Sequence, residues 1–247
     1  AGGTDTFTIV LDTEPTANVV IGLTSSDTTE GTVSPSSVTF TTGNWNSAQT
    51  VTLTGVNDDI DDGNIAYSIV TAAATSSDSD YSGLNASDVS VSNTDNDTAG
   101  ITQSATSGTI NEDGTGTYTV VLDSEPTSDV TVTISSNDTG AATATSSLTF
   151  TSSNWSSAQT VTITGVSDSD FTDESVTISH SVSGGGYDAV SMTNYTATIT
   201  DTGGTFAGLT YGLVTSPDTD RVWLDRNLGA TQVATSSTDS AAYGYLF

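Results

Sequence analysis

A long internal repeat constrains the fold of this chain more than any other feature. FTIVLDTEPT at residues 7–16 returns as YTVVLDSEPT at residues 118–127, and VTFTTGNWNSAQTVTLTGV at residues 38–56 returns as LTFTSSNWSSAQTVTITGV at residues 148–166. The period of about 110 residues is the size of a domain and too long for one turn of a solenoid. The sequence therefore predicts two homologous domains in tandem.

Within each repeat, apolar residues alternate with Thr and Ser, the pattern of half-buried antiparallel strands. Phe7, Ile9 and Leu11 form one such run, and Tyr118, Val120 and Leu122 form its copy. About seven short runs per repeat, separated by Gly, Pro, Asn, Asp and Ser, are typical of an immunoglobulin-like sandwich. We therefore expect an all-β chain with two tandem antiparallel β-sandwiches.

The domain boundaries follow from the extent of the repeat. We expect a first sandwich over residues 1–97 and a second over residues 98–202. Residues 203–247 carry no copy of the repeat and read as an incomplete C-terminal β segment of a further domain.

The charge balance is strongly acidic. Thirty acidic residues stand against two basic ones, Arg221 and Arg226, and the formal net charge is -28. Salt bridges within the chain cannot neutralise this excess, so solvent counterions or bound metal must do so. Such a surface argues against nucleic acid and anionic membranes as partners.

Other compositional features narrow the class of protein. There is no cysteine, so the fold has no disulfide framework and no thiol chemistry, and no apolar run is long enough for membrane insertion. With so many acidic, Thr and Ser residues, the composition suggests a secreted or surface-anchored bacterial protein that relies on ions. His180 is the only histidine, and no nucleophile motif accompanies it. We therefore expect no enzymatic activity.

The acidic residues gather at strand ends. Asp58, Asp59, Asp61 and Asp62 follow the strand that ends at Gly55. Two like charges about 4 Å apart repel by roughly 4 kcal/mol at an effective dielectric near 20, so such a cluster needs a cation or must splay into water. Calcium takes six to eight oxygen ligands in a forgiving geometry that loops can supply, whereas transition metals prefer His or Cys.

The strand that ends in GVNDDIDDGN, the closing NTDND and the repeat body between them resemble the Calx-beta domain. This family comprises calcium-binding sandwiches of sodium/calcium exchangers and large bacterial surface proteins. The resemblance covers residues 1–202, twice over, and implies that acidic residues of the first strand, of two loops and of the last strand bind Ca²⁺. The implied ligands are Glu30, Asp58, Asp59, Asp62, Asp95 and Asp97 in the first repeat, and Glu112, Asp138, Asp168, Asp170, Asp173 and Asp201 in the second.

Each repeat departs from the family pattern at one or more positions. The first-strand glutamate of the first repeat would fall just before Ala1, and Ser169 stands where the first repeat has Asp59. The C-terminal stretch TYGLVTSPDTDRVWLDRNLGA, followed by AAYGYLF, resembles the opening of the Fibrobacter succinogenes major paralogous domain of bacterial surface proteins. We derive no function from this second resemblance.

These observations favour a calcium-binding structural or adhesive module of an extracellular bacterial surface protein, with calcium rigidifying the loops and the inter-domain junction. Expected partners are calcium ions, neighbouring domains or copies of the same protein, and a surface glycan or protein receptor. One alternative is a filament subunit assembled by strand exchange. Another is an accessory carbohydrate-binding module of a secreted enzyme, for which Trp45, Trp155 or Trp223 would be exposed. Packing against the core is the expected role of Trp45 and Trp155.

Overall fold

The computed structural model describes residues 2–168, 172–201, 203–206, 209–215 and 222–224, with side chains through Asp201. The chain divides into two compact units, unit one (Ala1–Thr98) and unit two (Ala99–Phe247). Every regular element in the described residues is a β-strand, and they contain no helix with the length and apolarity of a membrane span.

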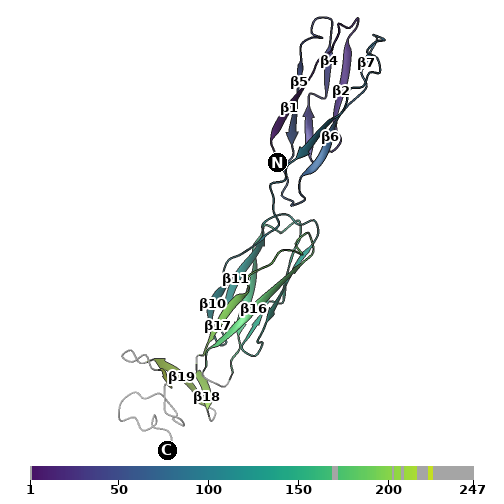
Figure 1. Cartoon of the computed structure of the whole chain (residues 1–247). Helices are drawn as coiled ribbons and strands as arrows, with labels where there is room; N and C mark the ends of the chain where they lie inside the picture. The colour runs from purple at the N-terminus through teal and green to yellow at the C-terminus, as the bar shows by residue number, and fades with distance from the viewer. Residues whose placement is uncertain (1, 169–171, 202, 207–208, 216–221, 225–247) are drawn as a thin grey trace, which may run out of the picture. The chain divides into compact units, whose positions relative to one another are not determined.

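Unit one is a sandwich of two antiparallel sheets (Figure 1). One sheet has the order β1-β5-β3, and the other has the order β4-β2-β6-β8, with β7 also paired to β2. The strands of unit one are β1 (Thr4–Ile9), β2 (Val19–Ser25), β3 (Gly31–Ser34), β4 (Ser37–Phe40), β5 (Gln49–Gly55), β6 (Ile65–Thr71), β7 (Thr75–Ser76) and β8 (Val89–Asn93).

Unit two repeats this plan with two additional strands, β9 and β10, and its described residues include no counterpart of β7. Its sheets have the orders β13-β15-β11-β9 and β10-β17-β16-β12-β14, and β10 is parallel to β17. The strands are β9 (Ile101–Gln103), β10 (Ser107–Asn111), β11 (Thr115–Leu122), β12 (Val130–Ser136), β13 (Ala142–Ala144), β14 (Ser147–Phe150), β15 (Gln159–Gly165), β16 (Glu174–Ser183) and β17 (Tyr195–Thr200).

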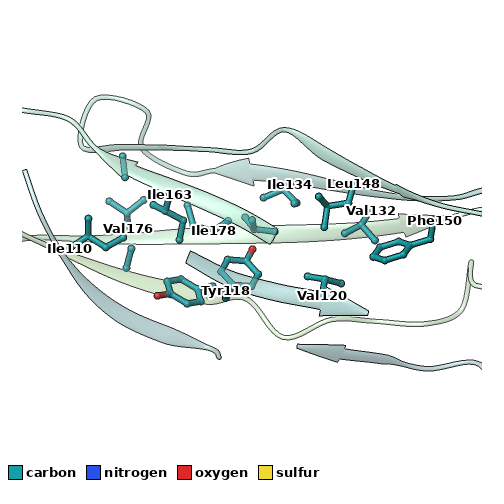
Figure 2. Packing of buried hydrophobic residues seen from close by; sticks show 14 of the residues in the cluster. Ile110, Tyr118, Val120, Val132, Ile134, Leu148, Phe150, Ile163, Val176 and Ile178 are labelled. Atoms are coloured by element: carbon teal, nitrogen blue, oxygen red, sulfur yellow. The ribbon is translucent and has the colours of Figure 1, made fainter. Parts of the chain in front are cut away.

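Alternating burial accounts for both sandwiches. In β5, Val51 and Leu53 are 0% and 5% exposed, while the threonines between and beside them face outward. Val161 and Ile163 of β15 are buried in the same way. Figure 2 shows the resulting core of unit two, where side chains of both sheets interdigitate. The predicted fold class, an all-β chain of tandem antiparallel sandwiches, is confirmed.

The repeated Asn-Trp pair forms the turn ahead of β5 and of β15. In unit one, the Asn44 side-chain Oδ1 accepts the Thr41 amide at 2.6 Å, and the Trp45 carbonyl accepts the Leu11 amide at 3.1 Å. The Trp45 ring packs partly buried against the core, as does Trp155 in unit two. The two tryptophans therefore have the packing role that the sequence indicates.

Three short strands follow unit two's sandwich and form a sheet of their own. They are β18 (Gly203–Phe206), β19 (Leu209–Thr215) and β20 (Val222–Leu224). The predicted boundaries at residues 97 and 202, and the assignment of residues 203–247 to a further domain, stay predictions.

The cores generate a first testable prediction. Phe150 is 0% exposed, so Phe150→Ala should lower the free energy of unfolding of unit two by about 3–5 kcal/mol. Phe40→Ala should do the same to unit one. Leu84 is 57% exposed, and Leu84→Ala should cost less than about 0.5 kcal/mol. Guanidinium denaturation followed by tryptophan fluorescence measures all three, and equal effects of Phe40→Ala and Leu84→Ala would contradict the described core.

Candidate metal centres

Unit one gathers carboxylates from two loops at one end of its sandwich. Glu30 directly precedes β3, and Asp58 and Asp62 lie in the loop between β5 and β6. One carboxylate oxygen from each of these three residues lies within 4.8 Å of the other two. The group could therefore hold a metal ion.

Main-chain and amide contacts fix Glu30 in this position. Its side chain is 8% exposed, and Asn93 Nδ2 donates to Glu30 Oε2 at 3.2 Å and to the Val56 carbonyl at 2.7 Å. The Val56 amide in turn donates to the Glu30 carbonyl at 2.9 Å. The end of β8 thus ties the buried carboxylate to the loop that carries the aspartates.

Two further aspartates reach the same place from the end of β8. Asp95 Oδ2 accepts the Gly63 amide at 2.7 Å, and Asp95 Oδ1 accepts the Asp97 amide at 2.8 Å. Asp95 and Asp97 line a hollow of about 10 Å³, close to the space that one water molecule needs. The other residues around this hollow are Glu30, Val56, Asp58, Asp62, Gly63, Asn93 and Thr94.

The pKa shifts in unit one show that desolvation and neighbouring negative charges oppose the ionisation of two clustered carboxylates. Desolvation, reinforced by the charges of Asp58 and Asp95, raises the pKa of Asp62. Desolvation also raises the pKa of Asp97, with added repulsion from Asp95, Asp59 and Asp58. By contrast, backbone amides of Asp97 and Gly63 lower the pKa of Asp95. All six residues predicted for this repeat therefore lie in or beside one acidic cluster.

Unit two has a comparable group at the corresponding end. Glu112 directly follows β10, Asp168 lies in the loop after β15, and Glu174 is the first residue of β16. Their carboxylate oxygens again lie within 4.8 Å of one another. Glu112 is 7% exposed, and its Oε1 accepts the Asp168 amide at 3.1 Å.

Glu174 was absent from the predicted ligands, which included Asp173 instead. Asp173 Oδ1 accepts the Asp201 amide at 3.0 Å and so connects the ends of two segments beside the cluster. Glu174 lies two residues before the buried Val176 and therefore shares its side of the strand. Extending the period-two pattern by one step would have selected Glu174.

Asp138 was predicted as a calcium ligand, but it lies in a turn outside the three-carboxylate group. Its Oδ1 accepts the Gly140 amide at 2.9 Å within its own turn, and it belongs to neither three-carboxylate group found in the described part of the chain. The Val166 amide donates to the Ala141 carbonyl at 2.8 Å, as the Val56 amide does to Glu30. Ala141 is therefore the counterpart of Glu30. The predicted ligand Asp170 lies outside the described residues.

Comparison with known proteins gives structural similarity only. No protein-family model matches the sequence, and no curated relative does either. The solved structure of CBD12 from CALX1.2 is 13% identical, covers 80% of this chain and 93% of its own, and has a TM-score of 0.37. Domains 4 and 5 of the S-layer protein SbsC are 14% identical, with coverages of 73% and 76% and a TM-score of 0.37. The calcium binding domain CBD12 of CALX1.1 is 18% identical, with coverages of 74% and 75% and a TM-score of 0.35.

The opposite pKa shifts in unit one predict opposite effects of two isosteric substitutions. In EDTA at neutral pH, Asp62→Asn should raise the melting temperature of unit one, because it removes a carboxylate whose ionisation is opposed in the folded state. Asp95→Asn should lower it, because ionised Asp95 is favoured by the amides it accepts. Differential scanning calorimetry measures both.

The pH dependence of the melting temperature provides a control for these two substitutions. A raised pKa means that Asp62 contributes stability below its unfolded pKa, and this contribution is lost as pH rises through the folded value. The gain from Asp62→Asn should therefore vanish on acidification below about pH 4. Melting shifts of the same sign for both variants at neutral pH would contradict the described cluster.

Proposed function

We propose that this chain is a calcium-binding structural module of an extracellular bacterial surface protein. One observation carries the proposal: each repeat brings three carboxylates, from more than one segment of the chain, within 4.8 Å of one another at the corresponding end of its sandwich. A solvated acidic surface would have no reason to place them so in both copies. The chain has only two Lys or Arg residues, so little internal cationic charge is available to offset them.

The ligand chemistry favours calcium over other metals. All the grouped side chains are carboxylates, and neighbouring main-chain carbonyls and water can complete an irregular oxygen shell, which Ca²⁺ accepts. Mg²⁺ requires a nearly ideal octahedron, and transition metals favour nitrogen and sulfur ligands. Glu30, Asp58, Asp62, Asp95 and Asp97 would hold the ion in unit one, and Glu112, Asp168 and Glu174 in unit two.

The role of the ion in this proposal is mechanical. In unit one it joins the segment before β3, the loop after β5 and the chain that leaves β8. Asp97 immediately precedes the last residue of unit one, so binding would also order the chain where it leaves this unit. The module would thus act as a stiffened spacer or adhesive segment, without catalysis. Its further partners would be neighbouring domains, copies of the protein, or a surface receptor.

A glycan-binding role is less well supported. Trp45 and Trp155 are partly buried and pack against the two cores, which leaves less ring surface for stacking on a sugar. We therefore do not propose the carbohydrate-binding alternative.

Calcium titration of the whole chain tests the proposal. We expect calorimetry to show binding with Kd of about 10⁻⁴ to 10⁻³ M, as in extracellular modules. Calcium at about 100 times Kd should stabilise each unit by roughly 2.7 kcal/mol, with a much smaller effect of Mg²⁺. Asp58→Asn should weaken binding in unit one, and Asp168→Asn should weaken it in unit two.

Two exposed turn carboxylates provide matched controls. Asp12→Asn and Asp129→Asn remove the same charge outside the clusters and should leave both Kd values unchanged. Unchanged melting curves in calcium up to about 100 mM, or equal weakening by cluster and control substitutions, would refute the proposal.

A further inference from the structure

The strand registers show which residue of unit one occupies the place of His180, the only histidine in the chain. β2 and β12 each begin with a valine opposite a phenylalanine, so their fifth residues, Leu23 and Ile134, are counterparts. Leu23 lies opposite Thr71 in the β2–β6 pair. Ile134 lies opposite His180 in the β12–β16 pair. His180 in unit two therefore takes the place of Thr71 in unit one.

Two aromatic residues of unit two also differ from their counterparts in unit one. Phe7 occupies the place of Tyr118, because each lies opposite the third residue of β5 or of β15. Val89 occupies the place of Tyr195, because each lies opposite the isoleucine two residues before Thr71 or His180. Unit two thus has two tyrosines and a histidine where unit one has phenylalanine, valine and threonine.

The three side chains of unit two are in contact. Tyr118 Oη and His180 Nε2 are hydrogen-bonded, and the two rings meet edge to face with their centroids 5.8 Å apart. The Tyr195 ring stacks on that of Tyr118 at 4.7 Å, with 14° between the planes. Both tyrosines are buried, and Figure 2 shows Tyr118 among the core side chains. We call Tyr118, His180 and Tyr195 the Tyr-His-Tyr cluster.

The Tyr-His-Tyr cluster connects the two sheets of unit two. Tyr118 lies on β11, whereas His180 and Tyr195 lie on β16 and β17 of the other sheet. The core between these sheets consists mainly of apolar side chains, so the hydrogen bond is a polar contact from one sheet to the other. Its loss would weaken the association of the two sheets.

Burial favours the neutral form of both hydrogen-bonded side chains. It raises the pKa of Tyr118 far above its ordinary value, so the hydroxyl keeps its hydrogen and donates it to His180 Nε2. His180 Nδ1 is buried and has no hydrogen-bond partner of normal geometry among the described residues. A weaker interaction with the Thr193 backbone favours the protonated ring, but burial outweighs it and lowers the pKa of His180.

Protonation of His180 would break this hydrogen bond. A neutral imidazole has one acceptor nitrogen, whereas both nitrogens of the imidazolium are donors. Nε2 would then carry a hydrogen, and the Tyr118 hydroxyl would lose its acceptor inside the core. The site would also hold a desolvated positive charge, which is costly without a charged partner.

The neighbouring carboxylates do not offset such a charge. The titratable residues on or next to the elements around His180 are Tyr118 on β11, Asp129 ahead of β12, Glu174 at the start of β16, Tyr187 and Asp188 after β16, and Tyr195 on β17. Asp188 Oδ1 accepts the Gly184 amide at 2.8 Å, and Tyr187 Oη donates to the Ser124 carbonyl at 2.7 Å. The causes of the pKa shift of His180 are burial and the Thr193 backbone, with no carboxylate among them.

We propose that the Tyr-His-Tyr cluster makes unit two acid-sensitive: when His180 takes up a proton, the polar contact between the sheets is lost and unit two loosens. Unit one lacks this response, because Phe7 and Thr71 occupy the corresponding places. Mild acidification would therefore weaken one unit of the chain selectively. The response is independent of calcium.

The direction of the pH dependence follows from the lowered pKa of His180. Stability contributed by the neutral ring is fully present above the unfolded pKa of about 6.5 and is lost as pH falls through the lower folded value. For each pH unit between these two values, the equilibrium constant for unfolding at acid pH rises about tenfold.

NMR titration of the whole chain in EDTA tests the proposal, because a single histidine gives a single set of ring signals. We expect the ring nitrogen shifts at neutral pH to place the hydrogen on Nδ1, and the titration midpoint to lie below about 6.5. Tyr118→Phe removes the donor to Nε2 and should raise the midpoint. Tyr81→Phe removes a hydroxyl that bonds Thr13 in unit one and should leave the midpoint unchanged.

A non-titrating variant tests the effect on stability. His180→Gln keeps an acceptor for the Tyr118 hydroxyl and cannot take up a proton at this pH. Calorimetry in EDTA at about pH 7.5 and about pH 5 brackets the histidine titration. The melting temperature of unit two, assigned through Phe150→Ala, should fall more on acidification in the unaltered chain than in His180→Gln. The melting temperature of unit one, assigned through Phe40→Ala, should respond to pH equally in both chains.

Three results would overturn the proposal. The first is a titration midpoint of His180 at or above about 6.5, or a neutral ring with its hydrogen on Nε2. The second is an unchanged midpoint in Tyr118→Phe. The third is an equal loss of stability of unit two in His180→Gln and in the unaltered chain. The first measurement needs no substitution, so it decides the matter even where a variant fails to fold.

Discussion

Burial of alternating apolar side chains between two sheets is the interaction on which each unit depends. It fixes which face of every strand turns inward and the register in which neighbouring strands pair. Because the same registers recur in both units, the loops after β5 and β15 lie at equivalent places. Carboxylates that are far apart in the sequence, such as Glu30 and Asp95, meet only because this packing brings their strand ends together.

The acidic clusters oppose the stability of this arrangement, because they hold like charges together. Desolvation and neighbouring negative charges oppose the ionisation of Asp62 and Asp97, whereas backbone amides favour the ionisation of Asp95. A bound cation would convert this repulsion into attraction between segments. Stability would then depend on the ion concentration through the binding equilibrium, which suits a protein that works where calcium is abundant.

The sequence predicts the fold well because period-two alternation and a long repeat are both visible without coordinates. It also predicts which segments of unit one contribute carboxylates, since these directly follow or precede strands. For unit two, the three-carboxylate group differs from the predicted ligands in two ways, because it contains Glu174, which was not predicted, and does not contain Asp138. Glu174, and not Asp173, joins Glu112 and Asp168 in the three-carboxylate group because it shares the inward side of β16. Asp138 is the counterpart of Asp27, which accepts a backbone amide in the same turn of unit one, and Ala141 stands in the place of Glu30.

Following backbone amide chemical shifts during a calcium titration tests the central claim most directly. Amides that donate to carboxylates in or beside the clusters include those of Gly63, Asp97, Asp168 and Asp201. We expect these four to shift first, with half-saturation at millimolar calcium or below. The Gly140 and Asp80 amides donate to turn aspartates outside the clusters and should barely respond. Equal shifts in both sets of amides, or none in the first set, would contradict the account.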